Sequence, residues 1–391
     1  MILALIAAAV AAASIPVADS TPILRGRESP SGLRVVALDA DGVTVEGGDG
    51  STRDVLGWER IAGVEGPLGA EAAAFARTAD AAWRARARLD RGDIAGAEPL
   101  FEELFASYEG RRGPTSAGVA AGLLRCRLLR GAQTGAVAPW LAYLEAAGQG
   151  TPTAGVGAAV GAGVVMDGPT GLVPALPPIW LDVASVRAFA RTPASAEDGG
   201  RASAMGALYL AAARIEAGLG GTLPPEPTDD AGLRLVWEVV ASRGGDESLR
   251  TAAREALTAR LGRALPAWTE AWCRVAIGRS LLKETAREAR LLGVAELLEL
   301  PARLEGASPY LTGVAMAEAA VALVGLDDVD GAVSVRADLQ SRLPGHPALE
   351  WEPIRGWSGV DPAFTQPPPA EPVAPASPIT PSVDAAPGDP P

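Results

Sequence analysis

The stretch RLDRGDIAGA, residues 88–97, decides the fold of this chain because it occurs twice. The second copy, RLLRGAQTGA, covers residues 127–136 and is identical at six of the ten positions. Apolar residues fall at helical spacing before and after each copy, which predicts two helices joined by a short turn. A decapeptide that returns after 39 residues indicates one structural unit that is used more than once.

Three positions of each copy have a physical role in such a turn. The glycine ends the first helix and lets the chain reverse, and the alanine lets the two helices approach closely. An aromatic residue four positions after the alanine lies on the same face of the second helix. The positions are Gly92, Ala97 and Phe101 in the first copy, and Gly131, Ala136 and Trp140 in the second.

This arrangement resembles the tetratricopeptide repeat (TPR), a helix–turn–helix unit of about 34 residues. The period here is 39, and the additional residues fall in YEGRRGPTSAG, 108–118, which we expect to be a loop. The first unit has Ala81, Ala85 and Arg88 where Trp, Gly and Tyr are common in the family. The sequence therefore predicts divergent, TPR-like pairs of antiparallel helices.

A third unit is predicted near the C-terminus, where an apolar helix over 311–326 is followed by a second helix over 327–348. Ala332 takes the close-packing position, and Pro344 follows twelve residues later, as in the family. Asp327 stands where glycine is usual.

The resemblance implies a partner-binding surface, because helical repeats bind proteins on the face that their first helices line. The matching positions are Ala82, Arg86 and Leu89 in the first unit, and Ala121, Arg125 and Leu128 in the second. The two arginines would then lie one repeat apart, where their guanidinium groups can hold a carboxylate of a partner. The alternative is that both are ordinary surface arginines of an Arg-rich chain.

The chain before the repeats has a different pattern. Residues 20–67 contain short β-branched runs, LRVVAL, GVTVE, TRDVLGW and RIAGV, which are separated by Asp- and Gly-rich turns. Such a pattern predicts a meander of short antiparallel strands. Since fewer than fifty residues make a marginal core, we expect a small SH3-like β-module that leans on the following helices.

The remaining boundaries follow from composition. Residues 69–150 hold the two repeated units, and residues 151–180 are rich in Gly and then Pro, which predicts a connector. Helical spacing resumes over 181–350, a helical domain that ends in the third unit. Residues 362–391 are Pro- and Ala-rich and predict a disordered tail.

The N-terminus predicts export. Within residues 1–19, Ile2 to Ala13 is an uncharged apolar run, too short for a bilayer span and typical of a signal-peptide core. Ala11-Ala12-Ala13 supplies the small residues of a cleavage site. We therefore expect a periplasmic or extracellular protein, and an uncleaved, membrane-anchoring signal is the alternative.

Bulk composition narrows the partners and the redox chemistry. The chain has 391 residues, 48% of them hydrophobic, and a net charge of −13, which disfavours nucleic acid as a partner. The two cysteines, Cys126 and Cys273, lie in apolar helical patterns. They are expected to be buried core residues, with a disulfide between them as the alternative.

The sequence offers little for catalysis. His346 is the only histidine and Lys283 the only lysine, so neither a Ser-His-Asp triad in the core nor a zinc site is indicated. His346 is expected in a surface loop, and Lys283 is not in a phosphate-binding loop motif. The pairs Glu102-Glu103, Asp229-Asp230 and Asp327-Asp328 are expected to be solvated. No cofactor and no metal are predicted.

The leading hypothesis is an exported, mainly α-helical, non-catalytic protein that binds or scaffolds other proteins through TPR-like repeats. Its protein partner is not identified by the sequence, and association with the cell envelope is possible. One alternative is an envelope hydrolase that uses carboxylates in a helical fold. The other is a structural envelope component that is anchored by its tail.

Overall fold

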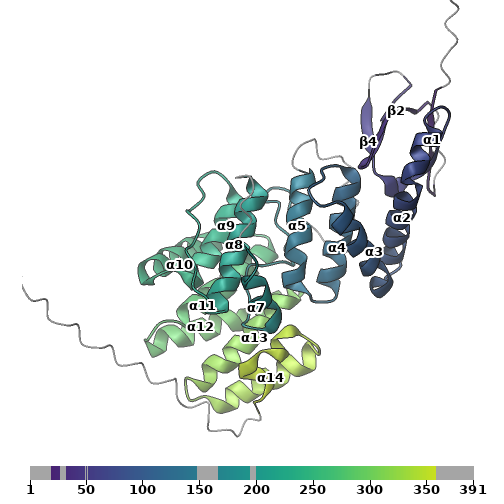
Figure 1. Cartoon of the computed structure of the whole chain (residues 1–391). Coiled ribbons are helices and arrows are strands. Elements are labelled where there is room, and N and C mark those ends of the chain that lie inside the picture. Colours follow the sequence, from purple (N-terminus) through teal and green to yellow (C-terminus); the bar gives the residue numbers. More distant parts are fainter. Residues whose placement is uncertain are drawn as a thin grey trace, which may run out of the picture.

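Runs of β-branched residues form the first part of the structure, and helices form nearly all the rest (Figure 1). The computed structural model describes residues 19–26, 32–48, 50, 52–147, 166–193 and 200–357. Over these residues the chain is mainly helical with a small antiparallel β part near the N-terminus, which confirms the predicted fold class at that level. The predicted signal, apart from Asp19, and the predicted tail lie outside the described residues.

The described strands form two small antiparallel sheets. They are β1 (Thr21–Leu24), β2 (Arg34–Asp39), β3 (Gly42–Glu46), β4 (Arg53–Leu56) and β5 (Ile61–Glu65). One sheet has the order β2-β3-β4, and the other pairs β1 with β5. The sequence predicted β2 to β5 but missed β1, because β1 has four residues, includes Pro22 and pairs with a strand at the other end of the module.

The β part packs directly on the helices that follow. Asp41, in the turn between β2 and β3, accepts hydrogen bonds from the Ser116 hydroxyl (2.8 Å) and the Ser116 N–H (3.2 Å) through its carboxylate. Its carbonyl accepts one from Thr115 Oγ1 (2.6 Å), and Tyr108 donates its hydroxyl proton to the Ala40 carbonyl (2.6 Å). A strand turn therefore satisfies donors at the start of a helix.

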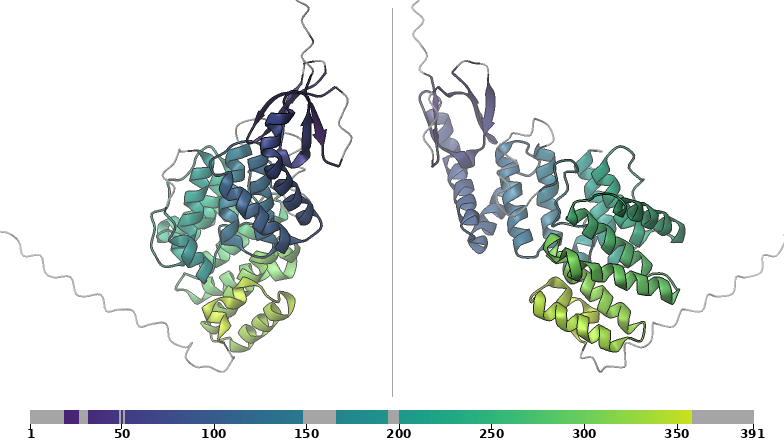
Figure 2. Two further views of the ribbon diagram at one scale, coloured as in Figure 1. Left: turned by 45° about the vertical axis from the view of Figure 1, so that its right-hand side comes forward. Right: turned by 180° about the vertical axis from the view of Figure 1, so that it is seen from behind.

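The helices follow one another along a curved row, with the strands at one end and α14 at the other (Figure 2). They are α1 (Gly69–Ala72), α2 (Ala76–Asp90), α3 (Ile94–Ser107), α4 (Pro114–Leu129), α5 (Gln133–Ala147), α7 (Ala184–Ala190), α8 (Arg201–Glu216), α9 (Ala231–Gly244), α10 (Glu247–Leu261), α11 (Ala267–Leu281), α12 (Arg287–Glu299), α13 (Pro309–Val324), α14 (Val329–Arg342) and α15 (Glu352–Arg355).

Helices that are neighbours in sequence pack in pairs. The pairs are α2 with α3, α4 with α5, α9 with α10, α11 with α12, and α13 with α14. First helices of successive pairs also contact each other: α2 touches α4, α9 touches α11, and α11 touches α13.

The prediction of a loop over 108–118 was wrong at its C-terminal end. Helix α4 already begins at Pro114, and proline fits the first position of a helix.

The turn inside a pair has the same backbone conformation in all three predicted units. In each unit, one residue within three positions of the end of the first helix has a positive φ: 79° at Gly92, 74° at Gly131 and 64° at Asp327. The next N–H then donates to a carbonyl in the last turn of that helix. These bonds join Asp93 to Arg88 (2.9 Å), Ala132 to Arg127 (2.8 Å) and Asp328 to Leu323 (3.0 Å). Asp327 thus adopts the left-handed conformation that glycine provides elsewhere.

The repeated arginine and the second repeated glycine bond to each other. Arg88 donates from Nη1 to the Gly96 carbonyl (2.9 Å), and Arg127 does the same to Gly135 (2.6 Å). A Cβ at Gly96 would lie 2.4 Å from Asp93 Oδ2 and 2.6 Å from Arg88 Nη1, so a larger residue there would make these side chains shift. We infer that the decapeptide recurs because its arginine forms a hydrogen bond between the end of the first helix and the start of the second.

Substitution of the turn residues tests this account. Gly92→Ala should lower the free energy of unfolding by about 1 kcal/mol, since an added Cβ meets nothing within 4 Å and the cost is purely that of a positive φ. Asp327→Gly should change it by less than about 0.5 kcal/mol, because aspartate already tolerates this conformation. Urea unfolding measures both, and equal losses would contradict the shared turn.

Candidate functional site

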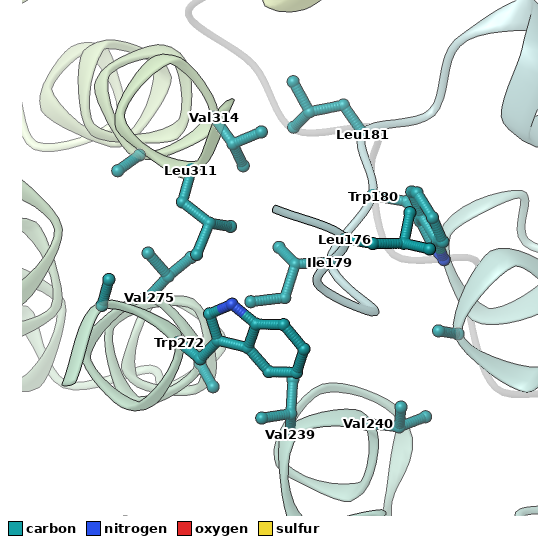
Figure 3. Close-up of a cluster of buried hydrophobic side chains, with 14 of the residues drawn as sticks. Leu176, Ile179, Trp180, Leu181, Val239, Val240, Trp272, Val275, Leu311 and Val314 are labelled. Atoms are coloured by element: carbon teal, nitrogen blue, oxygen red, sulfur yellow. The ribbon is translucent and has the colours of Figure 1, made fainter. Parts of the chain in front are cut away.

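Residues 171–181 lie between the first helices of the C-terminal half, as Figure 3 shows. Ile179 points toward Trp272 of α11, whereas Leu176 lies beside Trp180 on the other side of the segment. Six large apolar side chains of the segment are no more than 4% exposed: Leu172, Val173, Leu176, Ile179, Trp180 and Leu181. An extended piece of the chain thus fills the inner face of the row of helices.

The helices hold this segment by its carbonyl groups. Its prolines at 174, 177 and 178 have no N–H, so the segment cannot be a central strand or a helix. Side chains supply the donors instead. They are Trp140 to the Gly171 carbonyl (3.3 Å), Trp272 to Pro174 (3.1 Å), Tyr209 to Leu176, Tyr310 to Ile179 (3.0 Å) and Arg279 to Trp180 (2.8 Å). Buried carbonyls that would otherwise lack partners are satisfied in this way.

This finding changes the interpretation of the connector predicted over 151–180. Its first part lies outside the described residues, but its second part belongs to the largest hydrophobic core. Sequence reasoning missed this because apolar residues between prolines follow neither a helical nor a strand period. The sequence did contain one signal of burial, because a solvated linker does not need the large apolar residues that cluster between Leu172 and Trp180.

A buried network of charges lies beside the segment. Arg279 on α11 is 3% exposed, and its Nε donates to Glu318 Oε1 of α13 (2.8 Å). Its Nη2 lies 3.0 Å from Glu216 Oε2 of α8 and donates to the Trp180 carbonyl. Arg243 of α9 donates from Nε to the other Glu216 oxygen (2.9 Å). Four helices and the segment therefore meet in one set of ion pairs.

The network sets the protonation of its members. Burial by itself raises the pKa of Glu216, but the nearby Arg279 and Arg243 outweigh burial and hold the pKa below its ordinary value. Glu216 is therefore ionised at neutral pH. Glu216, Arg243 and Arg279 also line a small pocket, whose apolar wall includes Pro178 and Val239.

The predicted partner-binding arginines do come together. Arg125 Nη1 lies 3.4 Å from Asp90 Oδ1, and Arg86 Nε lies 3.8 Å from Asp90 Oδ2. Arg86 also has Glu59 within 3.9 Å. The Arg86 side chain is 42% exposed and that of Arg125 is 13% exposed. Two guanidinium groups from successive first helices thus share one carboxylate of the same chain.

The apolar positions named with them lie deeper. Ala82, Leu89 and Ala121 are buried, and Leu128 is half-buried against the main core. These side chains pack helices together rather than face solvent. Within this face, the arginines are the groups that a partner can reach.

His346 lies in surroundings different from those predicted. His346 lies in a loop, as predicted, but its ring is half-buried against Tyr310 and not on the surface. Nε2 bonds to the Tyr310 carbonyl (3.0 Å) and Nδ1 accepts from the Ala348 N–H (3.0 Å), which requires a neutral ring with its proton on Nε2. Burial lowers the pKa of His346 to about 4.

The cysteines follow the leading expectation. Cys126 and Cys273 are free and buried, so the alternative of a disulfide between them was wrong. Burial raises the pKa of Cys126 to about 11 and that of Cys273 to about 12. Both thiols are therefore protonated at neutral pH and act as small apolar core residues.

Comparison with known proteins yields no relative: no family model matches the chain, and neither a curated protein nor a solved structure matches it. Among the described residues, no three His, Cys, Asp or Glu side chains are grouped so that they could hold a metal ion. In the same part of the chain, no helix combines the length and the apolar character needed to cross a membrane.

Substitution of Arg279 tests how much the buried network contributes to the free energy of unfolding. Arg279→Met should lower the free energy of unfolding by about 3–5 kcal/mol, because it leaves Glu318 buried without its ion pair. Arg303→Met, which breaks a largely exposed pair with Glu270, is the control and should cost less than about 1 kcal/mol. Urea unfolding compares the two, and similar losses would refute a special role for Arg279.

The single histidine permits a direct pH test. As pH falls from 6.5 toward 4, the unfolded chain binds a proton that the folded chain excludes from His346. The contribution of this ring to stability is therefore complete above pH 6.5 and is lost on acidification. NMR titration of the ring should give a pKa near 4, whereas a value near 6.5 would show that the ring is solvated. His346→Gln should reduce the dependence of stability on pH in this range.

Proposed function

We propose that this chain is a non-catalytic protein that binds or scaffolds other proteins through TPR-like helix pairs, and that it acts after export to the cell envelope. The turn that recurs at Gly92, Gly131 and Asp327 is the observation that carries the proposal. A turn of one conformation between packed helices, with an alanine buried at the same offset, is what a helical repeat requires.

The small β part supports an SH3-like module within this proposal. Its sheets have the orders β1-β5 and β2-β3-β4, and a single 3-10 turn, Trp58–Arg60, lies between β4 and β5. Five short strands in two sheets that share a small core are compatible with a barrel of this kind. Its hydrogen bonds to α4 and the packing of β5 against α2 support a module that caps the first helices of the two N-terminal pairs.

The partner surface is assigned to the first two pairs. The inner face of the later pairs is filled by residues 171–181, so a partner cannot use it without displacing core residues. Arg86 and Arg125 remain beside solvent and are held together by Asp90. An acidic side chain or a terminal carboxylate of a partner can bind there in exchange for Asp90.

Export rests on the sequence alone. The apolar run of residues 1–19 carries it, and those residues lie outside the described chain except for Asp19. The partner should therefore be sought in the envelope fraction of the source cell.

A capture experiment tests the proposal. Tagged protein comprising residues 20–391 is compared with its Arg86→Gln/Arg125→Gln variant and with an Arg84→Gln control, also on α2. Glutamine is chosen because a glutamate would repel Asp90 and Glu59. An envelope protein bound by wild type and control, but lost by the double variant, is the expected result. It should bind with at least about tenfold lower affinity to the purified double variant.

Two results would oppose this assignment. Equal capture by the double variant would remove the binding role from Arg86 and Arg125. Failure of the wild type to capture any specific envelope protein would contradict the scaffold function itself. Circular dichroism of each variant checks that the helices remain folded.

A further inference from the structure

The surface that β1 and α2 share holds the only exposed aromatic ring among the described residues. Trp83, on α2, is 42% exposed, whereas the other eight of the nine tryptophans are buried or half-buried. The guanidinium of Arg25, which directly follows β1, lies over the Trp83 ring at 5.0 Å from its centroid and forms an ion pair with Asp80. Ile23 of β1 is exposed as well. A tryptophan that is held by its neighbours but open to solvent is typical of a contact surface.

Three arginines of the same helix face carry charges that no carboxylate neutralises. Arg77, Arg84 and Arg91 follow one another at intervals of seven residues on or directly after α2, so they lie along one side of the helix. All three are exposed. Within the described ranges, Arg77 and Arg91 make no side-chain hydrogen bond or ion pair, and Arg84 donates only to the Asp80 carbonyl of its own helix (3.3 Å). The exposed side of α2 is therefore positive, although the chain has a net charge of −13.

The tail, residues 362–391, contains a segment with a regular proline pattern. Every third residue of this segment is a proline, at positions 369, 372, 375, 378 and 381. Three residues make one turn of a polyproline II helix, so prolines at this spacing share one continuous edge of such a helix. A proline edge binds to exposed aromatic side chains, and it loses little conformational entropy because proline already restricts the unbound chain.

The charge of the tail is opposite to that of the exposed side of α2. The tail has no lysine or arginine, and its three carboxylates are Glu371, Asp384 and Asp389. Complementary charges speed the encounter of two surfaces and select the correct partner. A proline-rich, acidic segment therefore matches both the Trp83 ring and the arginines of α2.

The place where the tail begins favours a contact between two copies of the chain. The tail follows Trp357, whose ring centroid lies 5.8 Å from the Arg336 guanidinium of α14. Helix α14 lies at one end of the row of helices, and α2 lies beside the strands at the other (Figure 1). The tail of each copy thus begins at the opposite end of the row from its own Trp83.

We propose that the proline-rich segment 369–381 of one copy binds to Trp83 and the arginines of α2 on another copy, so that the protein associates head to tail. The proline edge packs on the exposed part of the Trp83 ring, and Glu371 pairs with an exposed arginine of α2. Because the two surfaces of this contact differ, each copy can bind two others. The inference does not rest on the proposed function, whose arginines, Arg86 and Arg125, pair with Asp90.

The oligomeric state of the chain, residues 20–391, tests the proposal directly. Sedimentation velocity between about 1 and 100 µM should give an average sedimentation coefficient that rises with concentration. The dissociation constant should be on the order of 10–100 µM, since one proline-rich segment buries little surface. Added salt should weaken the association, because part of the contact joins exposed opposite charges.

Variants of the α2 surface locate the contact. Trp83→Ala should weaken the association at least about tenfold, because it removes the aromatic contact. Arg77→Gln/Arg91→Gln should weaken it about fivefold, since each exposed ion pair contributes little. Leu292→Ala, at an exposed leucine of α12, is the matched control for the loss of an apolar surface residue and should change the constant by less than about twofold. Circular dichroism checks that each variant is folded.

A competition experiment leaves the protein itself unchanged. A synthetic peptide of residues 362–391 should dissociate the oligomers of the full chain, because it covers Trp83 without linking two copies. The control peptide has the same composition, but its prolines no longer recur at every third residue. It should compete at least about tenfold more weakly.

Three results would overturn the proposal. One is a chain that stays monomeric at about 100 µM, even if the peptide binds to it, since the contact would then lie within one copy. Another is a Trp83→Ala variant that associates as strongly as Leu292→Ala. The third is equal competition by the two peptides, because binding would then depend on composition and not on the proline edge.

Discussion

The buried guanidinium of Arg279 is the constraint on which the rest of the described structure depends. A charge in a protein interior is tolerated only when ion pairs and hydrogen bonds replace its hydration. Arg279 obtains them from Glu318 on α13, Glu216 on α8 and the Trp180 carbonyl. These partners come from three distant parts of the sequence. If one of them separates from Arg279, the buried charges that remain lose an ion pair or a hydrogen bond, which is costly in free energy. The C-terminal helix pairs and the segment 171–181 must therefore assemble together.

This constraint also decides where function can lie. In a row of helix pairs the inner face is the natural place for an extended ligand, since the first helices line it. Here the chain supplies that ligand itself, and aromatic donors such as Trp272 and Tyr310 hold its carbonyls. Under the proposed function, a partner is then left with the first two pairs, where Arg86 and Arg125 reach solvent. The β part caps that end of the row through Asp41.

The sequence predicted those parts of the structure that repeat or have a period. The helices follow from apolar spacing, and the turns at Gly92 and Gly131 follow from the duplicated decapeptide, because backbone conformation there depends on local residues. The segment 171–181 and the ion pairs of Arg279 could not be predicted, since their partners are up to 131 residues away. The pairing of Arg86 and Arg125 on Asp90 was half predicted: the repeat placed the arginines together, but only the fold shows that an internal carboxylate lies between them.

The most direct test is whether the segment and the helices around it unfold as one. Incorporation of 5-fluorotryptophan gives each of the nine tryptophans its own ¹⁹F signal, and single Trp→Phe substitutions assign Trp180 in the segment and Trp272 on α11. The account predicts that both native signals disappear at the same urea concentration, because Arg279 binds the segment and the helices in one network. Loss of the Trp180 signal while Trp272 remains native would show that the segment unfolds independently of the helices, and would contradict the account.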